Sequence, residues 1–129
     1  MSRARVILGL IAGVLLLLSA ASHSLLGGPA ILAELDKAGA PADLRFAVHA
    51  GWQFGGVAML ALGAVALAVH GWRYRGRSVP AAVPWALAAA YLGFGGWALV
   101  ASGFEPFWLV FVVPGLLFAV AAPPPRADR

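Results

Sequence analysis

The sequence contains no cysteine and few charged residues, and both shortages exclude classes of protein. Without cysteine the chain cannot form disulfides, thiolate zinc sites, iron–sulfur clusters or a cysteine nucleophile. Only 11% of the 129 residues are charged and 62% are hydrophobic, whereas soluble domains average about 25% charged and about 45–50% apolar residues. Nucleophile elbows, phosphate loops and metal-protease helices are also absent from the sequence. An ordinary water-soluble globular protein is therefore excluded.

Basic residues outnumber acidic residues, but they do not predict a nucleic-acid-binding protein. The formal net charge is +4, and a nucleic-acid-binding protein gathers its basic residues on one water-facing surface. Here the basic residues flank apolar runs instead. The pattern predicts the lipid bilayer, and not nucleic acid, as the main partner of the chain.

Four apolar stretches are long enough, or nearly long enough, to cross a bilayer as helices. A helix needs about 20 apolar residues to span the hydrocarbon, because its backbone polar groups must be satisfied internally. The stretch 107–122 is the shortest, at about 24 Å of helix, so it must stand nearly upright or thin the bilayer. The sequence thus predicts an all-α membrane protein whose four transmembrane helices form an up-down bundle. The predicted spans are residues 6–26, 46–69, 81–101 and 107–122.

The basic residues are distributed unequally between the two sides of this bundle. If the N-terminus is cytoplasmic, that side carries seven arginines and one aspartate, a net charge of +6. The other side then carries two basic and four acidic residues, a net charge of −2. Arginine-rich loops face the cytoplasm, so we expect an inner-membrane protein with both termini in the cytoplasm. The inner side is marked by Arg3, Arg5, Arg73, Arg75, Arg77, Arg126 and Arg129, and the outer side by Glu34, Asp36, Lys37, Asp43, Arg45 and Glu105.

The sequence also allows predictions for the first span and for the C-terminal residues. The first span could instead be a cleaved signal peptide, because Arg3 and Arg5 precede the apolar run and residues 19–21 resemble a small-residue cleavage site. The apolar run continues through Leu26, beyond that site, which favours a retained anchor. Residues 123–129 are predicted to form a short disordered cytoplasmic tail.

The connection between the first two spans contains an amphipathic segment. Gly27, Gly28 and Pro29 predict the end of the first helix, because glycine often caps a helix and proline cannot continue its hydrogen bonds. Residues 29–37 then predict a short separate helix with one apolar and one charged side. We expect this helix in the first outer loop, lying on the membrane surface.

A glycine pattern recurs in the second and third spans. The motif Phe-Gly-Gly-x-Ala stands at residues 54–58 and again at 94–98. Because the two spans run antiparallel, both glycine pairs fall at similar depth, and small residues allow close helix packing in lipid. Helix packing is the favoured interpretation, and room for a ligand is the alternative. The glycines concerned are Gly51, Gly55, Gly56, Gly95 and Gly96.

Polar side chains gather near the outer ends of the first two spans. Polar groups are costly within a membrane, so their positions point to function. Three of them on the second span recur every fourth residue and share one face, and three on the first span also cluster. A glutamate between the third and fourth spans is expected at the same level. The predicted outward-facing polar cluster consists of Ser19, Ser22, His23, Arg45, His49, Gln53 and Glu105.

Two histidines at one depth allow several interpretations. His23 and His49 could be the axial ligands of a b-type haem, because neutral imidazole ligates iron and membrane cytochromes use facing helices. Together with Glu105 they could bind a metal ion, although three ligands from three helices form no local motif. The structural alternative is an interfacial imidazole that is hydrogen-bonded to Gln53 or to a serine, beside an Arg45 side chain that reaches the lipid headgroups.

Four further residues have individual interpretations. Glu105 precedes Pro106 and is typical of a helix N-cap. His70 ends the second span and is expected to interact with the helix dipole or to anchor the helix end at the membrane interface. Tyr91 lies in mid-membrane, where its hydroxyl needs a partner across the bundle. Pro114 predicts a kink in the fourth span.

The favoured function is that of a small, non-enzymatic accessory or oligomerising subunit, which would assemble with itself or with a membrane complex. No acidic residue lies inside a predicted span, which argues against a proton-coupled exporter because such a mechanism needs an embedded carboxylate. Two alternatives stay open. One is a redox subunit that binds haem b or quinone through His23 and His49, and the other is a minimal dimeric transporter of small molecules.

Overall fold

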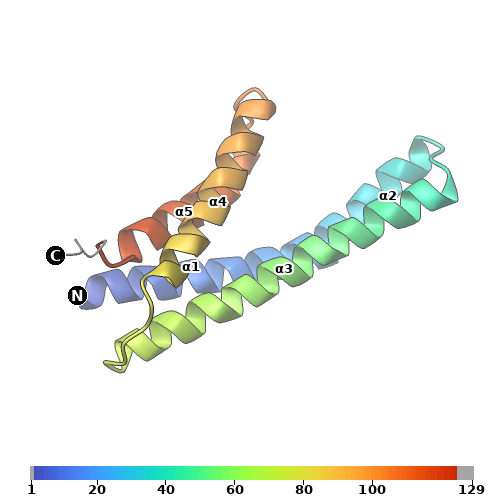
Figure 1. Cartoon of the computed structure of the whole chain (residues 1–129). Helices are drawn as coiled ribbons and strands as arrows, with labels where there is room; N and C mark the ends of the chain where they lie inside the picture. The colour runs from blue at the N-terminus through green and yellow to red at the C-terminus, as the bar shows by residue number, and fades with distance from the viewer. Residues whose placement is uncertain (1, 125–129) are drawn as a thin grey trace.

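The structure, a computed structural model, describes residues 2–124 and is built from helices in this range (Figure 1). This confirms the all-helical class. The predicted tail falls largely on residues 125–129, which include Arg126 and Arg129 and lie outside the described residues. In chain order the elements are α1 (Arg3–Ser22), the π-helical turn η1 (His23–Gly27), α2 (Gly28–Lys37), α3 (Ala42–Tyr74), α4 (Ala82–Ala101), the 3-10 turn η2 (Pro106–Trp108) and α5 (Leu109–Ala121).

Three helical segments are long and apolar enough to cross a membrane. They are Arg3–Lys37, Ala42–Tyr74 and Ala82–Ala101. A fourth segment, Pro106–Ala121, is apolar but shorter, as the sequence predicts. These helices fit a membrane bundle, which agrees with the apolar composition. The helix assigned to α5 continues through Pro114, and a kink at this residue stays a prediction.

The first helix does not end at the glycines, so that prediction was wrong. α1, η1 and α2 form one helical segment of 35 residues. Gly27 has φ −68° and ψ −38°, and Gly28 has φ −58° and ψ −56°, so both are right-handed helical. The segment 29–37 is consequently no separate surface helix, because α2 packs alongside the first turns of α3 (Figure 1). The helix ends at Lys37, and the chain turns at Gly39, whose φ is +66°.

The π-helical turn explains how the helix continues past a proline. The N–H of Gly28 reaches back five residues to the carbonyl oxygen of His23. In the same pattern the N–H of residue 29 would serve the carbonyl of Ser24, but Pro29 has no N–H. The side-chain amide of Gln53 on α3 takes its place, donating to the Ser24 oxygen at 3.5 Å. A neighbouring helix therefore satisfies the backbone group that the proline leaves free.

The four helical segments form two antiparallel hairpins that meet at one end. The first hairpin pairs the long α1–η1–α2 segment with α3, and the second pairs α4 with α5. α5 also packs against α1, and the hairpins diverge toward the α4–α5 connection (Figure 1). The helices alternate in direction as predicted, but they do not stay together over their whole length. The shared core consists of Ala12, Leu16, Ala66, Leu87, Ala88, Tyr91 and Phe118.

Glycines along the first hairpin alternate with side chains from the opposite helix. A Cβ atom on Gly13 would lie 2.9 Å from Cδ2 of Leu67, and one on Gly63 would lie 2.8 Å from Cδ2 of Leu17. Both separations are too short for real Cβ contacts. Each glycine is therefore covered by a side chain of its neighbour, which allows the backbones to approach closely.

His70 is not at an interface with water, which corrects the sequence-based prediction. Its side chain is completely buried where the two hairpins meet, and neither ring nitrogen has a hydrogen-bond partner among residues 2–124. The ring lies 6.3 Å from that of Phe118 on α5. On the other side it covers Gly9 so closely that a Cβ atom there would overlap the imidazole.

Candidate ligand-binding cleft

A reciprocal contact between His23 and Trp52 joins η1 to α3. The two rings are stacked, with centroids 4.4 Å apart and planes inclined by 2°. The indole N–H of Trp52 donates to the carbonyl oxygen of His23 at 2.7 Å. His23 Nε2 lies 2.9 Å from the carbonyl oxygen of Trp52 and must donate, because a carbonyl only accepts. A neutral His23 then carries its proton on Nε2, and Nδ1 is an acceptor.

His49 and Gln53 form the second part of the polar cluster. The amide of Gln53 donates to Nε2 of His49 at 3.2 Å and to the carbonyl oxygen of Ser24 at 3.5 Å. This bond to Gln53 is the structural alternative predicted for His49. Ser24 was not predicted to take part, and its carbonyl is free because the N–H of Gly28 bonds to His23 and Pro29 has no N–H. Recognising this role requires knowledge of the partner helix.

Arg45 and Glu105 lie outside this cluster. Arg45 pairs with Asp36 of α2 at 3.0 Å, and both side chains are about half exposed. Glu105 is exposed at the connection of the second hairpin, which diverges from the first (Figure 1). It occupies the predicted N-cap position of η2, but its side chain makes no capping hydrogen bond. The predicted gathering of Glu105 with the two histidines is therefore wrong.

The residues around the histidines do not fit a haem between η1 and α3. A Cβ atom on Gly27 would lie 2.8 Å from Cζ2 of Trp52, and one on Gly28 would lie 3.0 Å from Nε2 of Gln53. These contacts leave no gap for a macrocycle, and Nε2 of His23 is already engaged. Within residues 2–124, no group of three histidine, aspartate or glutamate side chains is arranged to hold a metal ion.

The glycines of the repeated motif have different surroundings. Gly55 is covered by His23 and Gly56 by Ser24. Gly95 packs against α5, since a Cβ atom there would lie 2.9 Å from Cβ of Phe111. A Cβ atom added to Gly51 or to Gly96 would have no neighbouring atom within 4 Å among the described residues. The two copies of the motif therefore serve different helix pairs.

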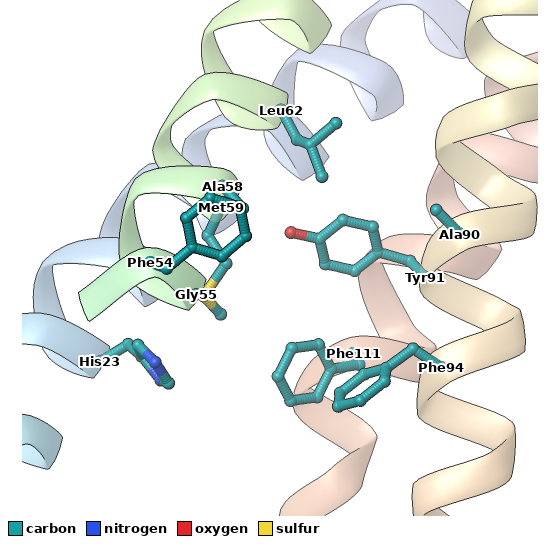
Figure 2. Close-up of a pocket in the computed structure, with 10 residues that line it drawn as sticks. All are labelled: His23, Phe54, Gly55, Ala58, Met59, Leu62, Ala90, Tyr91, Phe94 and Phe111. Carbon is teal, nitrogen blue, oxygen red and sulfur yellow. The ribbon is translucent and has the colours of Figure 1, made fainter. Parts of the chain in front are cut away.

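The divergence of the hairpins opens a cleft of two lobes. The first lobe, of about 490 Å³, lies between α3 and α4 (Figure 2). The second, of about 370 Å³, lies between the π-helical turn and the beginning of α5. The lobes share His23, Met59, Phe94 and Phe111, and so lie next to each other.

The walls of the cleft are apolar apart from a few uncharged polar groups. The first lobe carries His23 and the hydroxyl of Tyr91, which points across the cleft toward Ala58 and Met59 (Figure 2). The second lobe carries the hydroxyls of Ser19 and Ser22. The lining residues include no carboxylate, lysine or arginine. An apolar pocket with a few polar groups is typical of a binding site for a small molecule.

The cleft brings together only part of the predicted site. Ser19, Ser22, His23 and Gly55 line it, whereas the ring of His49 faces α2 near Gly28. The aromatic residues of α4 and α5 were not predicted to belong to the site. No protein-family model, curated protein or solved structure matches this chain.

Proposed function

We propose that the protein is a non-enzymatic, four-span protein of the inner membrane that holds a lipid-soluble molecule in the cleft between its hairpins. The observation that carries this proposal is the lining of the cleft, which is apolar, partly aromatic and free of charged side chains. Such walls favour an apolar molecule over an ionic substrate, because an ion would lose its hydration without gaining a partner.

The arrangement of charge supports an orientation with both ends in the cytoplasm. The end of α3, with Arg73 in its last turn and Arg75 and Arg77 directly after it, lies beside the end of α5, because Arg73 Nη1 donates to the carbonyl oxygen of Ala121 at 2.9 Å. Arg3 and Arg5 begin α1 at the same end of the molecule (Figure 1). The opposite tip carries the acidic residues of α2. Arginine-rich loops stay in the cytoplasm, so the cleft opens in the outer half of the membrane.

The lengths of the helices agree with this placement. α4 has 20 residues and is about 30 Å long, which matches the hydrocarbon core. The 35-residue segment is about 52 Å long, so the first hairpin tilts or projects beyond the outer surface. The ion pairs of its tip, Lys37 with Glu34 and Arg45 with Asp36, suit a position in the headgroups or in water.

The orientation is tested with reporter fusions. A reporter that is active only in the cytoplasm, inserted after Arg77, is expected to be active, and one inserted after Gly39 is expected to be inactive. The reverse pattern would overturn the orientation.

The ligand is tested with photo-methionine, a diazirine analogue of methionine. The sequence has two methionines, and Met59 lies where the lobes of the cleft meet. Irradiation of labelled cells is expected to attach a discrete small molecule at Met59. A matched control, Met59→Leu with Ala61→Met, moves the label to an exposed position of the same helix. Crosslinks at Met59 that are confined to the protein, or that give the same lipid mixture as the control, would contradict the proposal.

A further inference from the structure

Three hydroxyl groups line the cleft without a partner in the protein. The hydroxyls of Tyr91, Ser19 and Ser22 make no hydrogen bond within the described part of the chain. Tyr91 is only 6% exposed, and its oxygen points into the cleft (Figure 2). Ser19 is only partly buried and Ser22 is exposed, and a serine on a helix can turn its hydroxyl to a carbonyl of the preceding turn. Tyr91 is the decisive group, because a buried hydroxyl without a partner costs free energy and lipid offers no substitute. The occupant should therefore accept hydrogen bonds.

Aromatic rings form the part of the cleft where the two lobes meet. Phe94 and Phe111 lie edge to face, with centroids 4.9 Å apart. Trp108 contacts both, with centroids 6.1 Å from Phe94 and 6.0 Å from Phe111. On the opposite wall, the His23 ring is held by its stack on Trp52. Aromatic side chains favour other flat rings over flexible chains through stacked and edge-to-face contacts.

The chemistry of the lining separates the classes of membrane lipid. A phospholipid headgroup is charged, and no charged side chain lines the cleft. A bare acyl chain would leave the buried hydroxyl of Tyr91 without a partner. A flat ring with carbonyl oxygens and an apolar tail suits both the aromatic walls and the Tyr91 hydroxyl.

We infer that the occupant of the cleft is a prenylquinone, whose ring carbonyl accepts a hydrogen bond from the Tyr91 hydroxyl. The ring lies among Phe94, Trp108 and Phe111, and the tail leaves through the open side between the hairpins. This inference rests on the proposed function, because it names the ligand of the same cleft. It involves binding alone and no transfer of electrons.

The test compares two probes on the purified full-length protein in detergent. Decylubiquinone carries the oxygen-bearing ring, and decylbenzene carries an apolar tail on a ring without oxygen. Binding is titrated by native mass spectrometry. We expect decylubiquinone to bind more tightly than decylbenzene and the variant Tyr91→Phe to weaken decylubiquinone binding about 3- to 10-fold, the range for one lost hydrogen bond. Tyr74→Phe changes an exposed tyrosine of α3 and is expected to bind as the unaltered protein does.

The outcomes distinguish this inference from the proposed function. If both probes bind equally, or if Tyr91→Phe binds decylubiquinone unchanged while the cleft-filling variant Ala58→Leu abolishes binding, the cleft accepts apolar molecules generally and the quinone inference fails. If neither probe binds and photo-methionine at Met59 captures no small molecule, both proposals fail. Weaker decylubiquinone binding in Tyr91→Phe with retained decylbenzene binding would show that the variant is folded and would support the inference.

Discussion

His23 and Trp52 are each bound to the backbone of the other. Their rings stack at 4.4 Å, while His23 Nε2 and Trp52 Nε1 donate to each other's carbonyl oxygens at 2.9 and 2.7 Å. Both hydrogen bonds and the stack act at the π-helical turn, where the helix presents carbonyls that differ from those of a regular α-helix. The pair therefore fixes how the first helix lies on α3, and with it one wall of the cleft.

The variant Trp52→Phe is expected to destabilise the protein by about 1 kcal/mol, because it keeps an aromatic ring for stacking and removes one hydrogen bond. Unfolding by titration with a denaturing detergent measures the change. Trp97→Phe is the matched control, since Trp97 on α4 is 66% exposed and surface substitutions change stability by less than about 0.5 kcal/mol. Equal stability of the two variants would contradict the importance of the His23–Trp52 pair.

The sequence predicts the helices but not the π-helical turn. Apolar stretches of sufficient length identify the helices, because a backbone in lipid has few other options. The run Gly27-Gly28-Pro29 is typical of a helix end in isolation. It continues the helix here because two residues more than 20 positions later in the chain bond to this turn. Gln53 donates to the freed carbonyl of Ser24, and Trp52 donates to the carbonyl of His23, which the N–H of Gly28 also reaches. A local pattern cannot contain that information.

The adjacent residues Gly95 and Gly96 are expected to respond in opposite ways to alanine. A Cβ atom on Gly95 would lie 2.9 Å from Cβ of Phe111 and 3.0 Å from the backbone nitrogen of Val112, so Gly95→Ala should cost about 1–3 kcal/mol by forcing α5 away. Gly96 has no such neighbour, and Gly96→Ala should stabilise the helix by about 0.5–1 kcal/mol. Thermal unfolding of the two variants tests the pair, and effects of the same sign would refute this packing.

The candidate site could be predicted only in part for a related reason. The spacing of Ser19, Ser22 and His23 placed them on one helix near one depth, and all three line the cleft. The angle between the hairpins is not encoded in any short pattern, because it depends on packing between residues far apart in the chain, such as His70 and Phe118. That angle separates Glu105 from the histidines and brings Phe94 and Phe111 into the site.

Arg73 is expected to hold the end of α5 in place. Its Nη1 donates to the carbonyl oxygen of Ala121, one of the acceptors that a helix leaves unpaired at its C-terminus. Arg73→Gln should destabilise the protein by about 1–2 kcal/mol, and hydrogen exchange should become faster in the last turn of α5. Arg75→Gln removes an exposed arginine two residues later and serves as the control. Unchanged exchange in Arg73→Gln would contradict this role.

The contact between Gly9 and His70 is expected to be strongly coupled. Because a Cβ atom on Gly9 would overlap the buried imidazole, Gly9→Ala should destabilise the protein by about 1–3 kcal/mol. In the background His70→Ala the same substitution should cost nothing or become stabilising, because the overlap is gone and alanine favours the helix. A double-mutant cycle on the free energy of unfolding measures this coupling.

Gly71→Ala is the control for this cycle and should show no coupling to Gly9. Gly71 is next to His70, but a Cβ atom added to it would have no neighbouring atom within 4 Å in the described structure. Additive effects of Gly9→Ala and His70→Ala, within about 0.5 kcal/mol, would show that the imidazole does not occupy the space above Gly9. The hairpins would then meet in a different way from the packing that opens the cleft. A large coupling would instead support this packing, because only a direct contact across α1 and α3 makes the cost of one substitution depend on the other.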